Sequence, residues 1–368
     1  ITRPKRDLAV VVVDKTVPFR NWREHRSLYW LLEHLRIERP EGSEYDPAID
    51  YLGAVPGPEP GDPPIRTRDL TAAEASVADV LYFADTYGVY EGDLVSGSEM
   101  KTALDRTPKI YGGLELAEAE AAAGVPARGG TLIAEFNTFA SPTGSAAVDV
   151  MEATLGVRWT HWVGRYFPRL EETDEVPPWL RENWEREWDA DWEFEGPGYV
   201  LLYEDAHVEV LRVGEESGIR GLRIETGRPA DPVVADATEV AYSFWFDIVE
   251  PRAGTDVLAS YRWHLEDSGR ERLRARGLPE TFPAVCRRLA PGGGVAYYFA
   301  GDFIDNPIPS TRMPFAGYTT FKRWFEALRV APSESEFYWR FYVPLMTRLL
   351  EDAVDRRASR GVPSHGSR

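Results

Sequence analysis

Cysteine is almost absent from this sequence of 368 residues, which contains only Cys286. A single thiol excludes a disulfide within the chain and a zinc site built from cysteines. No apolar run reaches the roughly 18 residues that a membrane-spanning helix needs. Metal motifs are also missing, because there is no EF-hand loop, and no HxxxH or HxH spacing joins the histidines at positions 25, 34, 161, 207 and 264. We therefore expect no cofactor and leave only a carboxylate-rich Ca²⁺ or Mg²⁺ site open.

Positive charge is scarce, since 42 Lys and Arg stand against 60 Asp and Glu, a formal net charge of −18. This balance argues against sequence-independent binding of nucleic acid or of an anionic membrane. Neutral or cationic small ligands fit better. The basic start "ITRPKRD" would remain after removal of a signal peptide or membrane anchor, and an ordinary sequence boundary explains it equally well. We leave the compartment open and favour a bacterial, extracytoplasmic location.

Strand and helix patterns alternate over residues 7–165. The run "LAVVVVD" (8–14) is typical of a parallel strand buried on both faces. A helix should follow it, capped by Asn21 with Glu24, and Thr71 with Glu74 forms another capping box. Further strands are "IDYLGAV", "ADVLYFADTYGVY" and "GGTLIAEF". This alternation predicts an α/β fold with an open, mostly parallel, flavodoxin-like sheet and helices on both faces.

The pattern changes after residue 165. A helical segment, "VPPWLRENWEREW", precedes short alternating runs such as "GYVLLYE", "VEVLRV" and "GLRIET", which predict antiparallel strands. The α/β pattern resumes over residues 255–355. We therefore interpret residues 166–254 as an antiparallel β-rich insertion rather than a separate domain, and residues 356–368 as a flexible tail.

Polar residues, most of them acidic, recur where the predicted strands end. In an open α/β sheet, ligands bind beyond the carboxyl ends of the strands. Carboxyl groups that lie close together there can have their pKa values pushed apart, as general acid/base chemistry requires. Each acid taken alone could equally cap a helix or pair with an arginine. The residues at these ends are Asp14, Lys15, Asp85, Glu115, Glu135, Asn137, Asp302 and Asp305.

The segment "GGTLIAEF" resembles the strand that leads to the nucleophile in the class I glutamine amidotransferase-like superfamily. The stretch "FPAVCRRLAPGGGVAYYFAGDFID" is similar to the end of its trehalose-utilisation and β-galactosidase-trimerisation branches. The resemblance covers residues 7–165 and 255–330. An amidotransferase needs a cysteine after that strand, whereas this chain has Phe136, Asn137 and Thr138 there. The nucleophile is missing, so we do not expect glutaminase chemistry, and the trimerisation branch implies that such domains persist without catalysis.

Aromatic residues are abundant and favour a carbohydrate ligand. Trp184, Trp188 and Trp192 recur at a spacing of four, for which core packing is the default interpretation. The segment "RWTHWVGRYF" adds Arg165 and Tyr166. Sugar sites combine aromatic rings with carboxylates and arginine, because sugar faces are apolar while their edges form hydrogen bonds. Stacking of nucleic-acid bases would use the same rings but needs a basic groove.

These features lead to two hypotheses. The first is a glycan-active hydrolase with Glu135 as general acid or base and Asp302 or Asp85 as its partner. Residues expected to bind the carbohydrate or other small polar substrate are Asp14, Lys15, His25, Glu115, Asn137, Arg165 and Tyr166. The second is a non-catalytic scaffold or glycan-binding module of a cell-envelope or polysaccharide system. Clustered acids with perturbed pKa values favour the enzyme, and separately ion-paired acids favour the module. Homo-oligomers are compatible with either.

Overall fold

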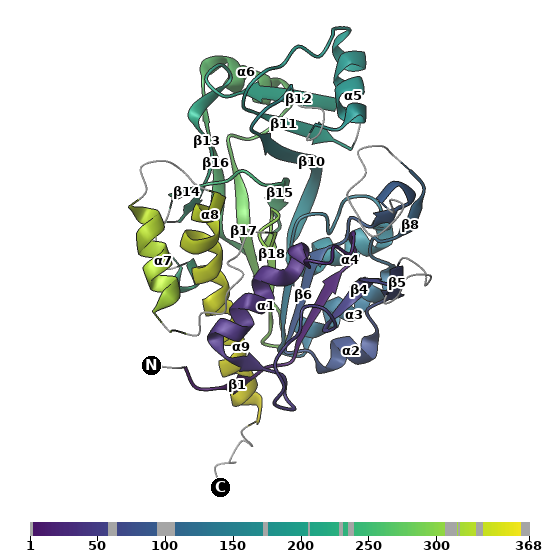
Figure 1. Ribbon diagram of the computed structural model, residues 1–368, viewed down its shortest axis with the longest axis vertical. Helices are drawn as coiled ribbons and strands as arrows, with labels where there is room; N and C mark the ends of the chain where they lie inside the picture. Colours follow the sequence, from purple (N-terminus) through teal and green to yellow (C-terminus); the bar gives the residue numbers. More distant parts are fainter. Residues whose placement is uncertain are drawn as a thin grey trace.

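The computed structural model describes residues 3–57, 65–93, 107–171, 176–204, 207–227, 231–234, 239–305, 315, 317–328 and 334–361. Within these ranges the main feature is a mixed ten-stranded sheet (Figure 1). Its strands, in spatial order, are β14 (Glu239–Ala241), β13 (Ser217–Thr226), β16 (Thr255–Leu265), β17 (Thr281–Leu289), β18 (Val295–Phe299), β9 (Thr131–Ala134), β6 (Val80–Asp85), β2 (Val10–Asp14), β4 (Tyr51–Pro56) and β5 (Ile65–Arg68).

The parallel part of this sheet has the flavodoxin-like strand order. Strands β4, β2, β6, β9 and β18 are parallel neighbours. Their order in the chain is 2-1-3-4-5, which places the topological switch point between β2 and β6. The predicted α/β fold class is therefore confirmed. Antiparallel strands extend the sheet beyond β18, and β5 pairs antiparallel with β4.

Helices cover the parallel strands on both faces, as right-handed crossovers require. Helix α1 (Arg23–Leu35) packs on β2 and β6 and contacts α9 (Val343–Gly361). Helices α3 (Leu116–Ala127) and α4 (Ser145–Leu155) pack against each other and the sheet, and α2 (Ala72–Val77) contacts α3. Helix α9 continues past Asp355, where we expected the tail to begin. No helix in the described ranges is long and apolar enough to cross a membrane.

A second, antiparallel sheet lies at one end of the molecule, with β1 and α9 toward the other (Figure 1). It contains β12 (His207–Arg212), β11 (Gly198–Tyr203), β10 (Val157–Phe167) and β15 (Phe246–Pro251). The predicted β-rich insertion is thus confirmed as antiparallel. Its strands are divided between two sheets, because β13 and β14 join the edge of the main sheet.

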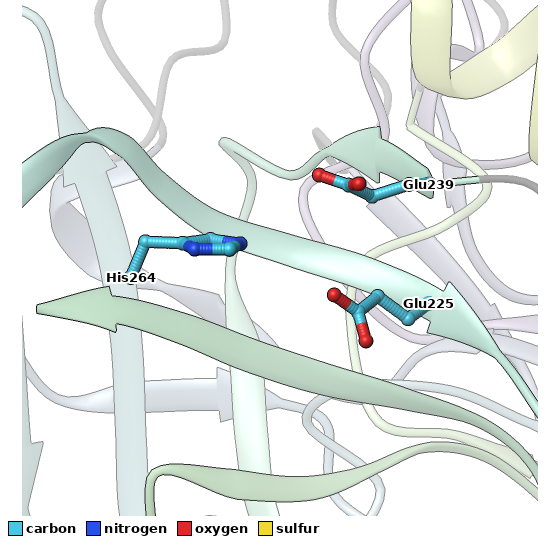
Figure 2. Close-up of side chains that lie close together, drawn as sticks. All are labelled: Glu225, Glu239 and His264. Atoms are coloured by element: carbon cyan, nitrogen blue, oxygen red, sulfur yellow. The ribbon is translucent and has the colours of Figure 1, made fainter.

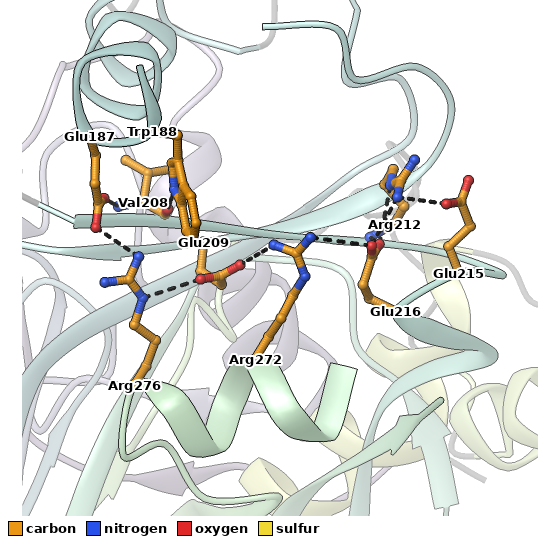
Figure 3. A network of polar contacts seen from close by, with 9 residues as sticks. All are labelled: Glu187, Trp188, Val208, Glu209, Arg212, Glu215, Glu216, Arg272 and Arg276. Carbon is orange, nitrogen blue, oxygen red and sulfur yellow. Dashed lines mark hydrogen bonds and ion pairs between the residues drawn. The ribbon is translucent and has the colours of Figure 1, made fainter. Parts of the chain in front are cut away.

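Helices α5 (Pro178–Trp188) and α6 (Asp267–Ala275) flank this second sheet. On α5 the Trp184 and Trp188 rings stack at 6.3 Å, and Trp184 meets Trp192 edge-on at 5.7 Å. The tryptophan series therefore packs largely within itself. A charge network ties α6 to β12 and α5 (Figure 3): Glu209 accepts hydrogen bonds from Arg272 at 2.7 Å and Arg276 at 3.2 Å.

The remaining elements are short or peripheral. Strand pairs β1 (Arg6–Asp7) with β3 (Ile37–Glu38), and β7 (Val89–Tyr90) with β8 (Lys109–Tyr111), lie outside the main sheet. Helix α7 (Tyr318–Ala327) precedes α8 (Glu334–Phe337), and a π-helical turn over Tyr338–Tyr342 leads into α9. Cys286 is buried in β17, and burial raises its pKa to about 12.

Candidate functional site

The switch point between β2 and β6 brings two acids together. Asp14 and Asp85 are the last residues of these strands and are register partners. The Asp85 carbonyl oxygen accepts a hydrogen bond from the Lys15 backbone at 2.8 Å. The Asp85 carboxylate accepts bonds from the Tyr87 backbone at 2.7 Å and from the Asn137 amide at 3.2 Å. The structure thus places Asp85 and Asn137 side by side at the rim, as we expected.

Three further carboxyl groups form what we call the acid cluster, Glu24, Asp302 and Asp305. One oxygen from each lies within 4.8 Å of the others. Glu24 comes from the first turn of α1, and the two aspartates follow β18. Arg23 bridges the cluster, with Nε 2.8 Å from Glu24 and Nη2 3.0 Å from Asp305. Carboxylate oxygens are ligands that Ca²⁺ or Mg²⁺ would accept, but the Arg23 guanidinium already occupies part of this set.

The acids at this rim perturb one another. Burial raises the pKa of Asp302 well above its usual range, and the charges of Asp305 and Asp85 raise it further. Burial and the charge of Asp305 likewise raise the pKa of Glu24. The pKa of Asp85 rises to about 7, through burial and the charge of Asp14. Crowded, partly desolvated carboxyl groups cannot all ionise together, so protonated and ionised acids lie side by side near neutral pH.

An arginine and aromatic rings lie beside the acid cluster. Burial raises the pKa of Asp305, and the Arg23 and Arg165 guanidinium groups limit that rise, which places Arg165 within electrostatic reach. The Arg165 guanidinium lies over the Trp245 ring at 5.6 Å, and Trp245 stacks with Phe136 at 5.7 Å. Tyr166, the next residue on β10, packs on Tyr199 at 5.2 Å instead. Successive strand residues point to opposite faces, so Tyr166 does not share the surroundings of Arg165, and its role in substrate binding stays a prediction.

Glu135 occupies a different environment from the one we expected. Its side chain is fully buried. Tyr82 donates a hydrogen bond to Oε1, and the Phe303 and Ile304 backbones donate to Oε2 at 2.9 and 3.0 Å. Both oxygens are therefore engaged inside the protein, so direct proton transfer from Glu135 to a substrate does not fit. Glu135 instead anchors the segment that follows Asp302.

Lys15 and His25, which follow β2 in the chain, are also held by contacts inside the protein. The buried His25 ring contacts the Asp14 carboxylate through Nδ1 at 2.6 Å and the Pro47 carbonyl through Nε2 at 2.9 Å. A carbonyl only accepts hydrogen bonds, so Nε2 carries a proton, and the ring orients Asp14. Lys15 is buried and its Nζ lies 2.7 Å from Glu118 and 3.1 Å from Asp69. Neither His25 nor Lys15 is placed to contact a substrate.

Glu115 does not join the other acids. It is exposed at the amino end of α3, where it forms a capping box with Glu118. For Glu115 the structure therefore shows a helix cap, the alternative role that we considered for each acid. Glu115 nevertheless provides a useful control position, because it is an exposed acid that follows a strand, β8, and is not part of the acid cluster.

Sequence reasoning missed Arg23, Glu24 and Trp245. Glu24 was assigned to a capping box with Asn21, but α1 begins after Trp22 in a left-handed conformation and has no side-chain cap. The Thr71 and Glu74 capping box, by contrast, is confirmed. The adjacent charges in "NWREHR" were the available signal for Arg23 and Glu24. Trp245 comes from the insertion, and no local pattern connects it with the rim.

A second titratable group lies on the antiparallel part of the main sheet (Figure 2). It consists of Glu225 of β13, Glu239 of β14 and His264 of β16, with one ligand atom of each within 4.8 Å of the others. Zinc accepts such a set. The two carboxylates, however, are already ion-paired with three guanidinium groups, those of Arg220, Arg223 and Arg262. A cation would have to displace them, so we interpret this group as a charge network on the sheet.

No protein-family model and no curated protein matches this chain. Solved structures with some likeness include an exo-β-1,4-mannosidase from Opitutaceae bacterium strain TAV5 (11% identity, TM-score 0.33, 91% of this chain and 35% of that chain). A β-galactosidase from Rahnella sp. R3 is similar at 11% identity (TM-score 0.31, 89% and 32%). A ThuA-like protein from Bacteroides uniformis is similar at 9% identity (TM-score 0.38, 91% and 96%). The chain spans about a third of the length of the two glycosidases.

Proposed function

We propose that this chain is a glycan-active hydrolase whose chemistry is performed by Asp302 and Asp305 at the carboxyl rim of the parallel sheet. The observation that carries the proposal is the acid cluster, in which oxygens of Glu24, Asp302 and Asp305 lie within 4.8 Å and the pKa of each acid is raised. Perturbed acids that converge at a switch point are candidates for catalysis.

The two aspartates have different surroundings, and these surroundings suggest their roles. Asp302 keeps its proton to higher pH because burial and neighbouring carboxylates raise its pKa well above the usual range. Asp305 lies 3.0 Å from the Arg23 guanidinium, which favours its ionised form. We therefore assign Asp302 as the acid that protonates the glycosidic oxygen and Asp305 as the carboxylate that attacks the anomeric carbon. The leaving group departs with the proton from Asp302. The Asp302 carboxylate then removes a proton from a water, which attacks the anomeric carbon and frees the sugar and the Asp305 carboxylate.

The spacing favours retention of anomeric configuration. Inverting glycosidases separate their carboxyl groups by about 6.5 to 9.5 Å to hold a water, whereas retaining enzymes use about 5 to 5.5 Å. One oxygen of Asp302 lies within 4.8 Å of one oxygen of Asp305, which leaves less room for an intervening water than the inverting arrangement needs. Arg165 and the Phe136 and Trp245 rings would hold the sugar. An aromatic ring packs against the apolar face of a sugar, and the guanidinium donates hydrogen bonds to the sugar hydroxyls.

The test is a hydrolysis screen against bacterial and plant glycans and aryl glycosides. Asp302→Asn and Asp305→Asn should each lower kcat by about a hundredfold or more. Glu115→Gln, an exposed acid outside the cluster, should leave it unchanged. Asp85→Asn removes a charge that raises the Asp302 pKa, so the alkaline limb of the pH profile should move to lower pH. An inverted product anomer, seen by NMR, would contradict the roles assigned here.

One observation favours the alternative, a non-catalytic scaffold or glycan-binding module. Arg23 already pairs with two of the three acids, Glu24 and Asp305. Absence of turnover on every glycan, together with glycan binding that survives Asp302→Asn, would favour that alternative. The extracytoplasmic bacterial location and a homo-oligomeric state stay predictions from the sequence.

A further inference from the structure

A surface pocket of about 600 Å³ lies at the opposite end of the parallel strands from the acid cluster. Gly129 lines it just before β9, and Gly292 and Gly293 line it just before β18. Helix α9 contributes Arg356 and Arg360. The volume falls within the roughly 300 to 1,000 Å³ range of small-molecule sites.

Glycine backbone forms one wall of this pocket, and the fold requires glycine there. An added Cβ at Gly292 would overlap the Ala127 carbonyl oxygen. Gly129 and Gly293 adopt left-handed conformations, with φ of 92° and 83°, which side chains disfavour. A wall without side chains lets a ligand approach the main chain closely. The glycines of the sequence "PGGG" before β18 therefore shape one side of this pocket.

Three guanidinium groups face this wall. Nε and Nη2 of Arg356 are buried and have no hydrogen-bond partner among the residues that the structure describes. The Asp352 carboxylate lies 3.9 Å from Nη2, at the outer limit of an ion pair, and Arg356 also faces the Tyr297 hydroxyl. The Arg356 side chain as a whole is 29% exposed and its ion pair with Asp352 is long, so an oxyanion in the pocket would accept charge-assisted hydrogen bonds from the accessible part of this guanidinium.

The other two arginines add charge that the surroundings only partly neutralise. Arg128 donates a hydrogen bond to the Ala75 carbonyl, and no carboxylate pairs with it in the described ranges. Burial and the charge of Arg360 lower the pKa of Arg128, which shows that the two guanidinium groups lie close together. Arg360 pairs with Asp79 at 2.6 Å. The pocket also contains Asp352 and Asp355, so its lining carries three positive and two negative groups.

We propose that this pocket binds the phosphate group of a small phosphorylated molecule, with Arg356 and Arg128 as its principal ligands. Guanidinium groups donate paired hydrogen bonds that match phosphate oxygens, and such charge-assisted bonds are about twice as strong as neutral ones. The volume exceeds what the phosphate group alone fills, so the rest of the molecule would occupy the glycine-lined part. This inference does not depend on the hydrolase proposal, because the acid cluster lies at the other end of the strands.

The experiment is isothermal titration calorimetry of the full chain with inorganic phosphate, glucose 6-phosphate and glucose. We expect saturable binding of the two phosphate-bearing probes and none of glucose. Arg356→Gln and Arg128→Gln should each weaken phosphate binding by about tenfold or more. Arg158→Gln is the matched control, since this exposed guanidinium pairs with Glu250 at 2.5 Å and lies on β10. Tighter binding of glucose 6-phosphate than of phosphate would support recognition of the whole molecule.

A variant that should bind phosphate more tightly makes the test independent of whether the arginine variants fold. Asp352 is half exposed and its carboxylate is the ion-pair partner of Arg356, so Asp352→Asn should bind both phosphate probes several-fold more tightly. The proposal is overturned if neither wild type nor Asp352→Asn binds phosphate or glucose 6-phosphate saturably up to about 10 mM. It is equally overturned if both arginine variants fold, by circular dichroism, and bind with wild-type affinity.

Discussion

Asp247, the second residue of β15, has a fully buried carboxyl group that accepts a hydrogen bond from the Tyr298 hydroxyl. Burial raises its pKa from 3.8 to about 7, although the Tyr298 and Trp159 side chains oppose the rise. The unfolded chain therefore releases this proton at lower pH than the folded protein does. Stability from the protonated form is fully present below about pH 4 and is lost as pH rises through about 7.

Asp247→Asn should remove this pH dependence, because the amide oxygen still accepts the Tyr298 bond but cannot ionise. Relative to wild type, the free energy of unfolding of the variant should rise by about 2 to 3 kcal/mol between pH 5 and pH 8. Urea unfolding at both pH values measures it. Asp191→Asn, at an exposed position, is the control and should show no such change. A constant difference between Asp247→Asn and wild type across this range would contradict the assignment.

At the residue scale, the sequence located the rim but not the environment of each acid. Asp14, Asp85, Asp302 and Asp305 were found because strand ends place side chains at a common edge. Glu135 was misjudged because β9 is buried on both faces, so hydrophobic periodicity does not show which way the next side chain points.

Glu209 illustrates how charge can fix one element against another. It lies on β12 with 2% of its side chain exposed, between Arg272 of α6 and Arg276, the residue that follows this helix. Arg276 also pairs with Glu187 of α5 at 2.7 Å and lies over the Trp188 ring at 5.4 Å (Figure 3). The network therefore joins β12 and α5 to α6, which comes after β13 to β16 in the chain.

Glu209→Gln should lower the free energy of unfolding by about 2 kcal/mol, because two partly exposed guanidinium groups lose a buried partner. Glu215→Gln is the matched control on the same network, since Glu215 is 58% exposed and pairs with Arg212. Its effect should be below about 0.5 kcal/mol. Urea unfolding gives both values, and hydrogen exchange should show faster opening of α6 in the first variant alone. Equal effects of the two substitutions would contradict a special role for Glu209.

At the element scale, the parallel strands were predictable because continuous β-branched runs mark strands buried on both faces. The division of the insertion between two sheets was not. Strands such as β11 and β13 have similar alternating patterns, yet β11 pairs with β10 and β12 while β13 pairs with β14 and β16. Partner choice depends on contacts across the whole chain, which local patterns do not encode.

On the scale of the whole molecule, the parallel strands run from the arginine-containing pocket at one end to the acid cluster at the other. Strand β18 begins after the glycine wall of the pocket and ends before Asp302, and β9 begins after Gly129 and ends before Glu135. Three arginines and two aspartates line the pocket at the amino ends, and three acids with Arg23 lie at the carboxyl ends. A chain with a net charge of −18 thus brings three arginines to one pocket. A search for basic clusters along the sequence did not reveal them, because Arg128 and Arg356 are far apart in it.

The burial of Cys286 has a practical consequence for attaching probes to this protein. The sole thiol is 1% exposed and its pKa of about 12 leaves it protonated at neutral pH, and only the thiolate reacts readily. The folded wild-type chain should therefore resist maleimide and Ellman's reagent, and react with one equivalent once unfolded in urea. A cysteine introduced at Glu115 would then accept a fluorophore or spin label at one chosen position without removal of the native thiol. Rapid labelling of the folded wild type would rule that strategy out.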